Sequence, residues 1–167
     1  MEHPYIFTSG TSFKKEDILD NSIKVIKTSR GGKITWHGPG QLICYLAIDL
    51  NKRSKDIRRF INTVEKSIIE TLKEYNIKTH SDKKNVGIWY SEKNKIKKVA
   101  AIGFKIRRWV AYHGFSLNID NNLNSYKKIN ACGIKDKGIT NLVSIKKQNY
   151  SEITNKLEKY LTNYLKI

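Results

Sequence analysis

The chain has 167 residues, which is enough to bury one sizeable hydrophobic core but few for two domains. Its apolar share of 39% excludes a disordered chain, and no apolar run approaches the length of a membrane span. The formal net charge of +17 excludes an acidic protein and admits polyanionic partners, namely nucleic acid, an acidic membrane surface or an acidic protein.

The first third of the chain alternates predicted strands with glycine-rich turns. His3–Thr8 reads as a strand opening after a proline, and Ile23–Thr28 alternates apolar and basic residues as a half-buried strand does. Arg30–Gln41 then places two glycine turns around residues 35–37. Glycine lets backbone N–H groups approach a ligand closely, so this stretch predicts a lined pocket. Leu42–Leu50 is almost continuously apolar and predicts a central strand covered on both faces.

The middle of the chain changes to a helical period and then back to strands. From Lys55 to Tyr75, apolar residues recur at three- and four-residue steps, which predicts a long amphipathic helix lying across the sheet, with Ser54 as its N-cap. Val86–Tyr90 predicts a strand. Lys98–Asn118 predicts two extended segments that reverse direction near Arg107–Trp109.

The last part of the chain returns to helix. Asn121–Ile129 predicts a short helix, and Tyr150–Ile167 predicts an amphipathic helix with Ser151 as its cap. Strands precede, separate and follow the helices without a regular βαβ rhythm. The sequence therefore indicates the α+β class, in one domain that covers residues 1–167.

The start of the chain and its two cysteines indicate a soluble, cytoplasmic protein. Met1 is followed by Glu2 and His3 rather than by a basic and then apolar leader, so we expect no targeting segment. Cys44 lies in an apolar stretch and Cys132 beside a glycine, a usage typical of a reducing compartment. The many lysines leave two interpretations open, solvated surface charge or attraction of a polyanion.

Two common kinds of site have no support in the sequence. The four histidines are scattered, and no His or Cys pair has the spacing of a zinc site, so we expect no metal. Neither glycine turn matches a P-loop or a dinucleotide fingerprint, which disfavours phosphotransfer.

Cys132 and Lys98 are the candidates for chemistry. The glycine after Cys132 leaves the backbone free, so that an N–H group can face an acyl oxygen while the sulfur attacks its carbonyl. The alternative is an inert loop thiol. Lys98 borders an apolar run, where a lysine either serves as a base or favours a neighbouring thiolate. The alternative is a strand-edge lysine that reaches water.

Taken together, the motifs of the chain resemble the LipB family, the octanoyl (lipoyl) transferases. The matching motifs keep the family's order and approximate spacing over nearly the entire chain: Arg30–Gln41, Tyr45, Asp49 and Leu50, Lys98–Gly103, His113–Asn118, Cys132–Ile134, Thr140 and Leu142. The resemblance implies a biotin/lipoate protein ligase-like catalytic fold, with a mixed sheet and flanking helices.

The resemblance also implies acyl transfer in protein lipoylation, without a cofactor. Family members take an octanoyl group from acyl carrier protein and hold it as a thioester on a cysteine. They then pass it to a lysine amine of a lipoyl domain. The implied acceptors are the lipoyl domains of 2-oxoacid dehydrogenases and the glycine cleavage H protein. We expect no stable nucleic acid and no membrane partner, and the positive charge would steer acidic protein partners.

Carried over residue by residue, the resemblance makes Cys132 the nucleophile and Lys98 the residue that lowers its pKa and relays protons. The implied lining of the acyl and pantetheine path is Arg30, Gly31, Gly32, Lys33, Ile34, Thr35, Trp36, His37, Ala101, Ile102, Gly103, Gly114, Phe115 and Ser116. For His37 and His113, a catalytic role and a structural hydrogen bond both remain open.

The sequence departs from the family pattern at three places. Almost nothing precedes His3, where the family has a helix and a strand, so we expect a domain that is short at its N-terminus. Ala131 stands where a proline commonly precedes the cysteine, and Trp36 replaces the usual Tyr or Phe.

Two rival functions remain at this stage. An ATP-dependent lipoate or biotin protein ligase on the same fold would not need a thiol at Cys132. A basic non-enzymatic protein would use its lysines to bind nucleic acid with strong salt dependence.

Overall fold

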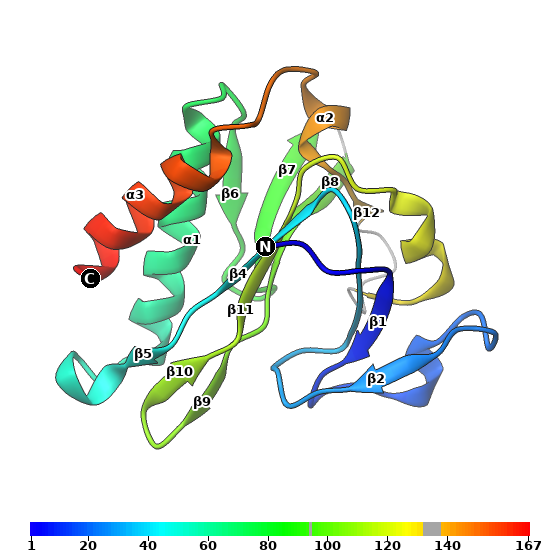
Figure 1. The fold of residues 1–167 in the computed structure, drawn as a ribbon, viewed down its shortest axis with the longest axis horizontal. Helices are drawn as coiled ribbons and strands as arrows, with labels where there is room; N and C mark the ends of the chain where they lie inside the picture. The colour runs from blue at the N-terminus through cyan, green and yellow to red at the C-terminus, as the bar shows by residue number, and fades with distance from the viewer. Residues whose placement is uncertain (94, 132–137) are drawn as a thin grey trace.

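A mixed sheet with helices on one face forms the centre of the computed structural model, which describes residues 1–93, 95–131 and 138–167 (Figure 1). Within these residues the strand order is β4-β11-β8-β7-β6, and β12 lies beside β8. Neighbouring strands are antiparallel, except that β12 is parallel to β8. The bounds are β4 (Gln41–Tyr45), β6 (Thr79–Ser81), β7 (Ile88–Glu92), β8 (Lys95–Ile102), β11 (Gly114–Asn118) and β12 (Gly138–Ile139).

Three strands of this main sheet bend and continue as a second sheet, of order β5-β10-β9. The pairing register of β11 with β4 and β8 carries over unchanged to β10 with β5 and β9. At the bend, the N–H of Gly103 donates to the carbonyl of Gly114 at 2.8 Å. The bounds are β5 (Ile48–Asp49), β9 (Lys105–Arg107) and β10 (Val110–Tyr112). The predicted reversal near Arg107–Trp109 is the turn between β9 and β10.

The apolar stretch Leu42–Leu50 is not the central strand that its composition predicts. It divides into β4 and β5 and continues into a short 3₁₀ helix (Leu50–Lys52), and β4 lies at the end of the strand order. The backbone of Met1 covers the outer edge of β4, because Ile43 donates its N–H to the Met1 carbonyl at 2.8 Å and accepts from the Met1 amine at 3.1 Å. The outer edge of β4 is therefore covered by N-terminal backbone and not by another strand of the main sheet.

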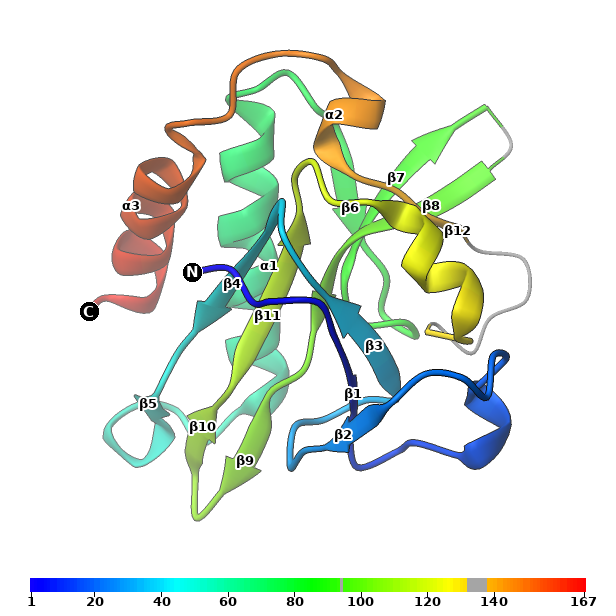
Figure 2. The ribbon, with the colours of Figure 1, turned by 45° about the vertical axis from the view of Figure 1, so that its right-hand side comes forward.

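A small sheet of order β2-β1-β3 lies on the side of the main sheet away from the long helices (Figure 2). The strand β1 (Ile6–Ser9) is parallel to β2 (Val25–Lys27) and antiparallel to β3 (Ile34–His37). This sheet has its own cluster of buried apolar residues, Phe7, Ile34, Trp36 and Ile129. The predicted helix over Asn121–Ile129, which packs against this region, is a 3₁₀ helix (Leu123–Lys128), and another 3₁₀ helix spans Lys15–Asp17.

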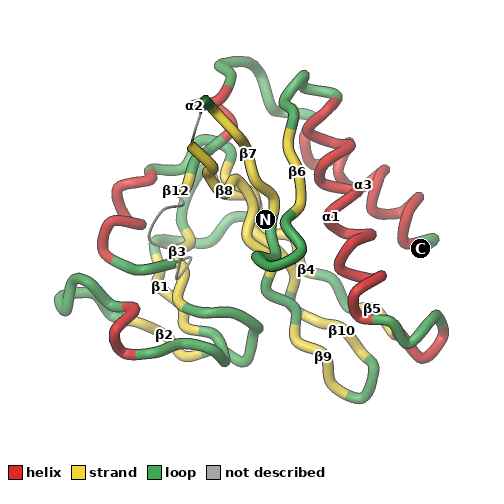
Figure 3. The backbone as a smooth tube through the Cα atoms, turned by 180° about the vertical axis from the view of Figure 1, so that it is seen from behind, coloured by secondary structure: helices red, strands yellow, loops and turns green. Residues whose placement is uncertain are grey.

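Two long helices, α1 (Ile57–Lys73) and α3 (Ile153–Leu165), pack against each other beside the main sheet (Figure 3). The apolar stripe of α1 is buried as its period predicts, at Phe60, Val64, Ile68 and Leu72. The cap of α1 is Asp56 rather than Ser54, since the Asp56 carboxylate accepts from the N–H of Arg59 at 2.9 Å. The N-cap of α3 is Glu152 rather than Ser151, without a side-chain hydrogen bond.

The remaining α-helix, α2 (Leu142–Ile145), precedes α3 in the chain and is a single turn. Its cap is Asn141, whose side chain accepts from the N–H of Ser144. Over the ranges that the structure describes, no helix combines the length and the apolar character needed to cross a membrane.

Candidate active site

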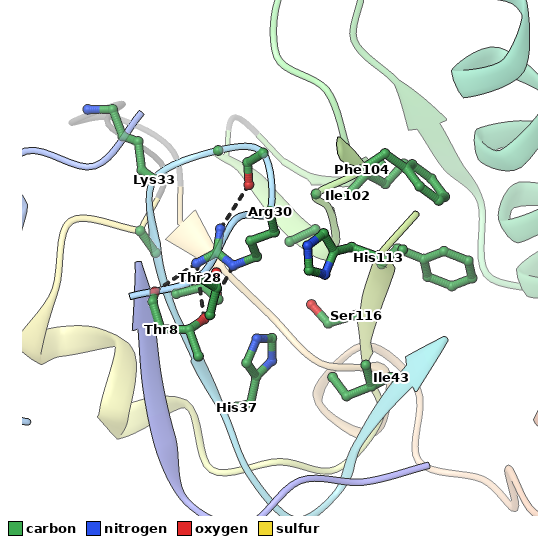
Figure 4. Close-up of a pocket in the computed structure, with 18 of the residues that line it drawn as sticks. Thr8, Thr28, Arg30, Lys33, His37, Ile43, Ile102, Phe104, His113 and Ser116 are labelled. Carbon is green, nitrogen blue, oxygen red and sulfur yellow. Dashed lines mark hydrogen bonds between the residues drawn. The ribbon is translucent and has the colours of Figure 1, made fainter. Parts of the chain in front are cut away.

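A cavity of about 710 Å³ lies between the main sheet and the small sheet. Its lining includes polar side chains, among them Thr8, Arg30 and His37 (Figure 4). It also includes apolar side chains from β4, β8, β9 and α1. The apolar members include Ile43, Ile57, Ile61, Ile102, Phe104 and Ile106. A cavity of this composition suits a molecule with a carbonyl or amide head and an apolar tail.

Most of the predicted substrate-binding residues come together on this cavity, although they lie on three strands (β3, β8 and β11), on the loop before β3 and at the bend after β8. Trp36 does not, because its side chain is 2% exposed in the core of the small sheet. The residues on the cavity are Arg30, Gly31, Gly32, Lys33, Ile34, Thr35, His37, Ala101, Ile102, Gly103, Gly114, Phe115 and Ser116, together with Lys98.

The guanidinium of Arg30 is held at the cavity by uncharged oxygens. Its Nη2 donates to the carbonyl of Thr8 at 2.7 Å and its Nη1 donates to the carbonyl of Gly31 at 2.9 Å. The hydroxyl of Thr8 accepts from Nε at 3.3 Å and from Nη2 at 3.1 Å. Burial lowers the pKa of Arg30 to about 10, so the group stays charged at neutral pH. A half-buried cation bonded in this way favours a partial negative charge on a ligand.

His37 is held as a neutral imidazole with a fixed tautomer. Its Nδ1 lies 2.7 Å from Oε1 of Gln41, and because an amide oxygen only accepts, Nδ1 carries the proton. Burial lowers the pKa of His37 to about 4, the Gln41 hydrogen bond opposes this, and nearby Arg30 and His3 act in the same direction as burial. At neutral pH His37 therefore has Nε2 available as a hydrogen-bond acceptor.

The amide of Gln41 is itself oriented by a buried polar network. Gln41 is fully buried, and its Nε2 donates to Oδ1 of Asn118 at 2.8 Å and to the hydroxyl of Tyr126 at 2.9 Å. The Asn118 Nδ2 in turn donates to the carbonyl of Thr140 at 3.0 Å. These contacts leave Oε1 of Gln41 facing His37, so the network determines which nitrogen of that imidazole accepts.

His113 lines the same cavity as Arg30 and His37 (Figure 4). Its Nε2 lies 3.0 Å from the hydroxyl of Ser29. Burial lowers the pKa of His113, and the positive charge of Arg30 lowers it further. His113 sits at the bend between β10 and β11 with a φ of 67°, which turns the chain where the two sheets join.

Lys98, on β8, lines the cavity, and its side-chain nitrogen makes two described contacts. Its Nζ donates to the carbonyl of Val86 at 3.2 Å and lies 4.6 Å from the centre of the Trp89 ring. These two contacts hold the end of the Lys98 side chain at the cavity. An ammonium in this place can stabilise a thiolate.

Cys132 lies outside the described residues, as does the rest of the predicted Cys132–Ile134 motif. The described neighbour in the sequence, Ala131, lines the cavity. On the other side, Ile139 also lines the cavity and is the register partner of Lys98 in the β12–β8 pair. The second cysteine, Cys44, is half-buried, and burial raises its pKa to about 11, which makes it a poor nucleophile at neutral pH.

Several residues that build the site carried no assigned role in the sequence. Thr8 holds Arg30, and Gln41 and Asn118 orient His37, although both belong to motifs that were otherwise recognised. A glutamine that opens an apolar strand is the signal that points to Gln41, since an amide buried there needs partners. Tyr126 gave no such signal. Over the described part of the chain, no group of three or more His, Cys, Asp or Glu residues is placed to hold a metal ion.

Comparison with known proteins gives a consistent result over most of the chain. Residues 2–162 match the family described as Lipoyl protein ligase A/B catalytic domain. The chain is 47% identical to an octanoyltransferase of Ehrlichia chaffeensis over 144 residues, covering 85% of this chain and 67% of the relative. It is 41% identical to an octanoyltransferase of Anaplasma phagocytophilum over 150 residues, covering 89% and 72% respectively.

The fold is similar to those of solved lipoate and biotin protein ligases. A bi-partite lipoate protein ligase from Thermoplasma acidophilum superposes with a TM-score of 0.77 at 14% identity, over 99% of this chain and 69% of that one. A biotin protein ligase from Aquifex aeolicus, in complex with biotin and ATP, gives a TM-score of 0.62 at 17% identity, over 95% and 67%. These likenesses confirm the predicted α+β, biotin/lipoate protein ligase-like fold.

Proposed function

Because the chain belongs to the lipoyl protein ligase A/B catalytic domain family, and within it to the LipB octanoyltransferases, we propose that it transfers an octanoyl (lipoyl) group through a thioester on Cys132. The proposed donor is octanoyl-acyl carrier protein. The proposed acceptors are lysine amines on lipoyl domains of 2-oxoacid dehydrogenases and on the glycine cleavage H protein.

The single observation that supports this proposal most directly is the shared cavity. Lys98, Arg30 and His37 line one cavity that has an apolar section, and Ala131, next to Cys132 in the sequence, lines it too. This arrangement offers a charged group for a thiolate, a guanidinium for an acyl oxygen, and apolar surface for a fatty chain.

In the first proposed step, the Cys132 thiolate attacks the carbonyl carbon of the donor thioester. A new carbon–sulfur bond forms, the donor's carbon–sulfur bond breaks, and the departing thiolate takes a proton from the Lys98 ammonium, which becomes the neutral amine. An ordinary cysteine is mostly protonated at neutral pH, so the Lys98 ammonium contributes by stabilising the thiolate. The acyl oxygen becomes negative in the tetrahedral intermediate, where the Arg30 guanidinium favours it.

In the second proposed step, the acceptor amine attacks the carbonyl carbon held on Cys132. A carbon–nitrogen bond forms, the carbon–sulfur bond breaks, and the sulfur leaves as a thiolate. The amine loses one proton, for which the neutral form of Lys98 is the proposed acceptor. Thioester to amide transfer is downhill, so the reaction needs no nucleotide.

The proposal is tested by mass spectrometry of the protein after incubation with octanoyl-acyl carrier protein. We expect one octanoyl adduct, released by hydroxylamine and mapped to the peptide that contains Cys132. Cys132→Ser should abolish both the adduct and transfer to a lipoyl domain. Lys98→Ala should slow both steps, because the thiolate loses its cation.

Cys44→Ser is the matched control, since it removes the other thiol of the chain and should leave the adduct unchanged. An adduct on Cys44, or turnover that survives Cys132→Ser, would contradict the proposed mechanism. Transfer of free octanoate that depends on ATP would identify a ligase on the same fold instead.

A further inference from the structure

The carbonyl that binds Lys98 belongs to a loop, and that loop is fastened at several points. Val86 O accepts from Nζ of Lys98, and Asn85 O accepts from Nε1 of Trp89 at 2.8 Å. The Asn85 amide donates to the carboxylate of Asp82 at 2.9 Å. The same indole that lies against the Lys98 ammonium therefore also holds the loop that supplies its carbonyl partner.

Two polar side chains of helix α1 hydrogen-bond to this loop, and they lie two turns apart on one helix face. Arg58 Nη1 donates to the carbonyl of Lys83 at 3.4 Å. The Glu65 carboxylate accepts from the backbone N–H of Gly87 at 3.2 Å. The Gly87 N–H and the Val86 carbonyl belong to the same peptide unit. The hydrogen bond from Gly87 to Glu65 therefore holds the peptide unit whose carbonyl binds Lys98.

Glu65 is an unusual residue for its position. It is 5% exposed, whereas the other buried side chains of α1 are apolar or carry only a hydroxyl, at Ser67 and Thr71. Burial raises the pKa of Glu65, and the nearby Asp82 acts in the same direction. The hydrogen bond from Gly87 and the charge of Arg58 oppose this rise. A carboxylate seldom stands in a core without a partner that requires it, and the described partner here is the Gly87 N–H.

Gly87 allows this loop to approach Lys98 closely. A Cβ at this position would lie 2.8 Å from the carbonyl oxygen of Ala100 and 3.1 Å from Cε of Lys98. Its φ of +136° is also one that other residues rarely adopt. The backbone at Gly87 is therefore packed against the aliphatic part of the Lys98 side chain. A shift of this segment would displace that side chain.

We propose that Glu65 is a positioning residue for Lys98: its carboxylate fixes the Gly87 N–H and thereby the Val86 carbonyl, which holds the Lys98 ammonium at the cavity. The inference rests on the proposed function, in which that ammonium stabilises the Cys132 thiolate. Glu65 itself touches neither substrate nor sulfur and acts through the loop.

The first test follows the side-chain amine of Lys98 by NMR, which requires no activity. Glu65→Gln keeps an oxygen that accepts from Gly87, and the Lys98 signal should stay in place. Glu65→Leu removes the acceptor while keeping the volume, and the signal should move. Glu70→Gln is the control, because Glu70 lies on the same helix and pairs with Lys73 at 3.6 Å. A Lys98 signal that is unchanged in folded Glu65→Leu overturns the inference.

The second test measures alkylation of Cys132 by iodoacetamide against pH, in a Cys44→Ser background. Glu65→Leu should move the alkylation curve to higher pH and slow the reaction at neutral pH by about tenfold, the effect of one pKa unit on the thiolate fraction. Glu65→Gln should restore the curve. The double variant with Lys98→Ala should be no slower than Lys98→Ala alone. Losses that multiply would show that Glu65 acts elsewhere.

The two proposals fail in different ways. If Lys98→Ala leaves the alkylation curve of Cys132 unchanged, the role given to Lys98 fails, and the NMR result still decides whether Glu65 positions it. Gly87→Ala provides a second variant if Glu65→Leu does not fold. It keeps Glu65 but displaces the loop, and we expect the same movement of the Lys98 signal. Its absence in the folded variant would equally overturn the inference.

Discussion

At the scale of single residues, the site shows how a partner determines what a side chain can do. An isolated histidine titrates near neutrality, but His37 lies where burial and Arg30 both disfavour its charged form. Gln41 then selects the tautomer, and Asn118 and Tyr126 select the orientation of Gln41. A single buried amide therefore makes His37 an acceptor at the cavity.

The lowered pKa of His37 predicts a loss of stability in acid. Below its ordinary value of 6.5 the unfolded chain binds a proton at this imidazole, whereas the folded chain does so only below about 4. The free energy of unfolding should therefore fall as pH drops through this window, by about 3 kcal/mol from this group alone at ~1.4 kcal/mol per pKa unit. Urea unfolding at a series of pH values measures it.

Carboxylates also titrate in this pH range. Two variants therefore separate the contribution of His37 to acid sensitivity from that of the carboxylates. His37→Gln should lose less stability than the parent protein between the two ends of this window. His80→Gln, at an exposed position on β6, should lose as much as the parent. Equal acid slopes in all three proteins would mean that the imidazole is not held neutral.

At the scale of elements, the start of α1 shows the limits of a local signal. Ser54 and Asp56 are both residue types that cap helices well, and the sequence pattern favours Ser54 as the cap, with Asp56 in the first turn. In the structure Asp56 accepts from the N–H of Arg59, and Ser54 lies before the helix. The choice follows from where residues 50–55 leave the second sheet, which is a tertiary constraint.

This assignment predicts unequal effects of two neighbouring substitutions. Asp56→Ala should lower the free energy of unfolding by about 1 kcal/mol, because an N–H group at the helix start loses its acceptor. Ser54→Ala should change it by less than ~0.5 kcal/mol, as expected of an exposed residue without a cap bond. Thermal or urea unfolding of both variants provides the measurement. A larger loss at Ser54 would return the cap to the residue that the sequence favoured.

At the scale of the whole molecule, charge is the dominant property. The chain carries 32 Lys and Arg residues against 15 Asp and Glu. Several of the described ion pairs, such as Lys14 with Glu16, are exposed and contribute little to stability. Excess positive charge of this size instead acts at a distance, by raising the rate at which negatively charged proteins arrive.

This charge predicts that transfer from a protein donor depends on salt. The kcat/KM with octanoyl-acyl carrier protein should fall roughly tenfold between about 50 mM and about 500 mM NaCl, because added ions screen the attraction. A neutral small thioester such as octanoyl-pantetheine is the control and should show little change. Equal salt dependence with both donors would place the effect in the chemistry rather than in the encounter.

The sequence predicted those features that local patterns encode. The period of α1, the reversal before Val110 and the glycine turns around Thr35 all depend on neighbours in the chain, and the structure has them. The cover on the outer edge of β4 comes from hydrogen bonds with Met1. The burial of Trp36 comes from its contacts in the small sheet. The roles of Thr8 and Tyr126 depend on partners far away in sequence, which no window of residues contains.

The cavity lies at a seam between two separately packed halves. One cluster of buried apolar side chains lies between the helices and the main sheet, and another lies beneath the small sheet. A fatty chain bound in this seam, as the proposed function requires, would touch both halves and add to the packing between them. If the proposed function holds, we therefore expect the protein with an acyl group in the cavity to be stiffer than the same protein after the group has left.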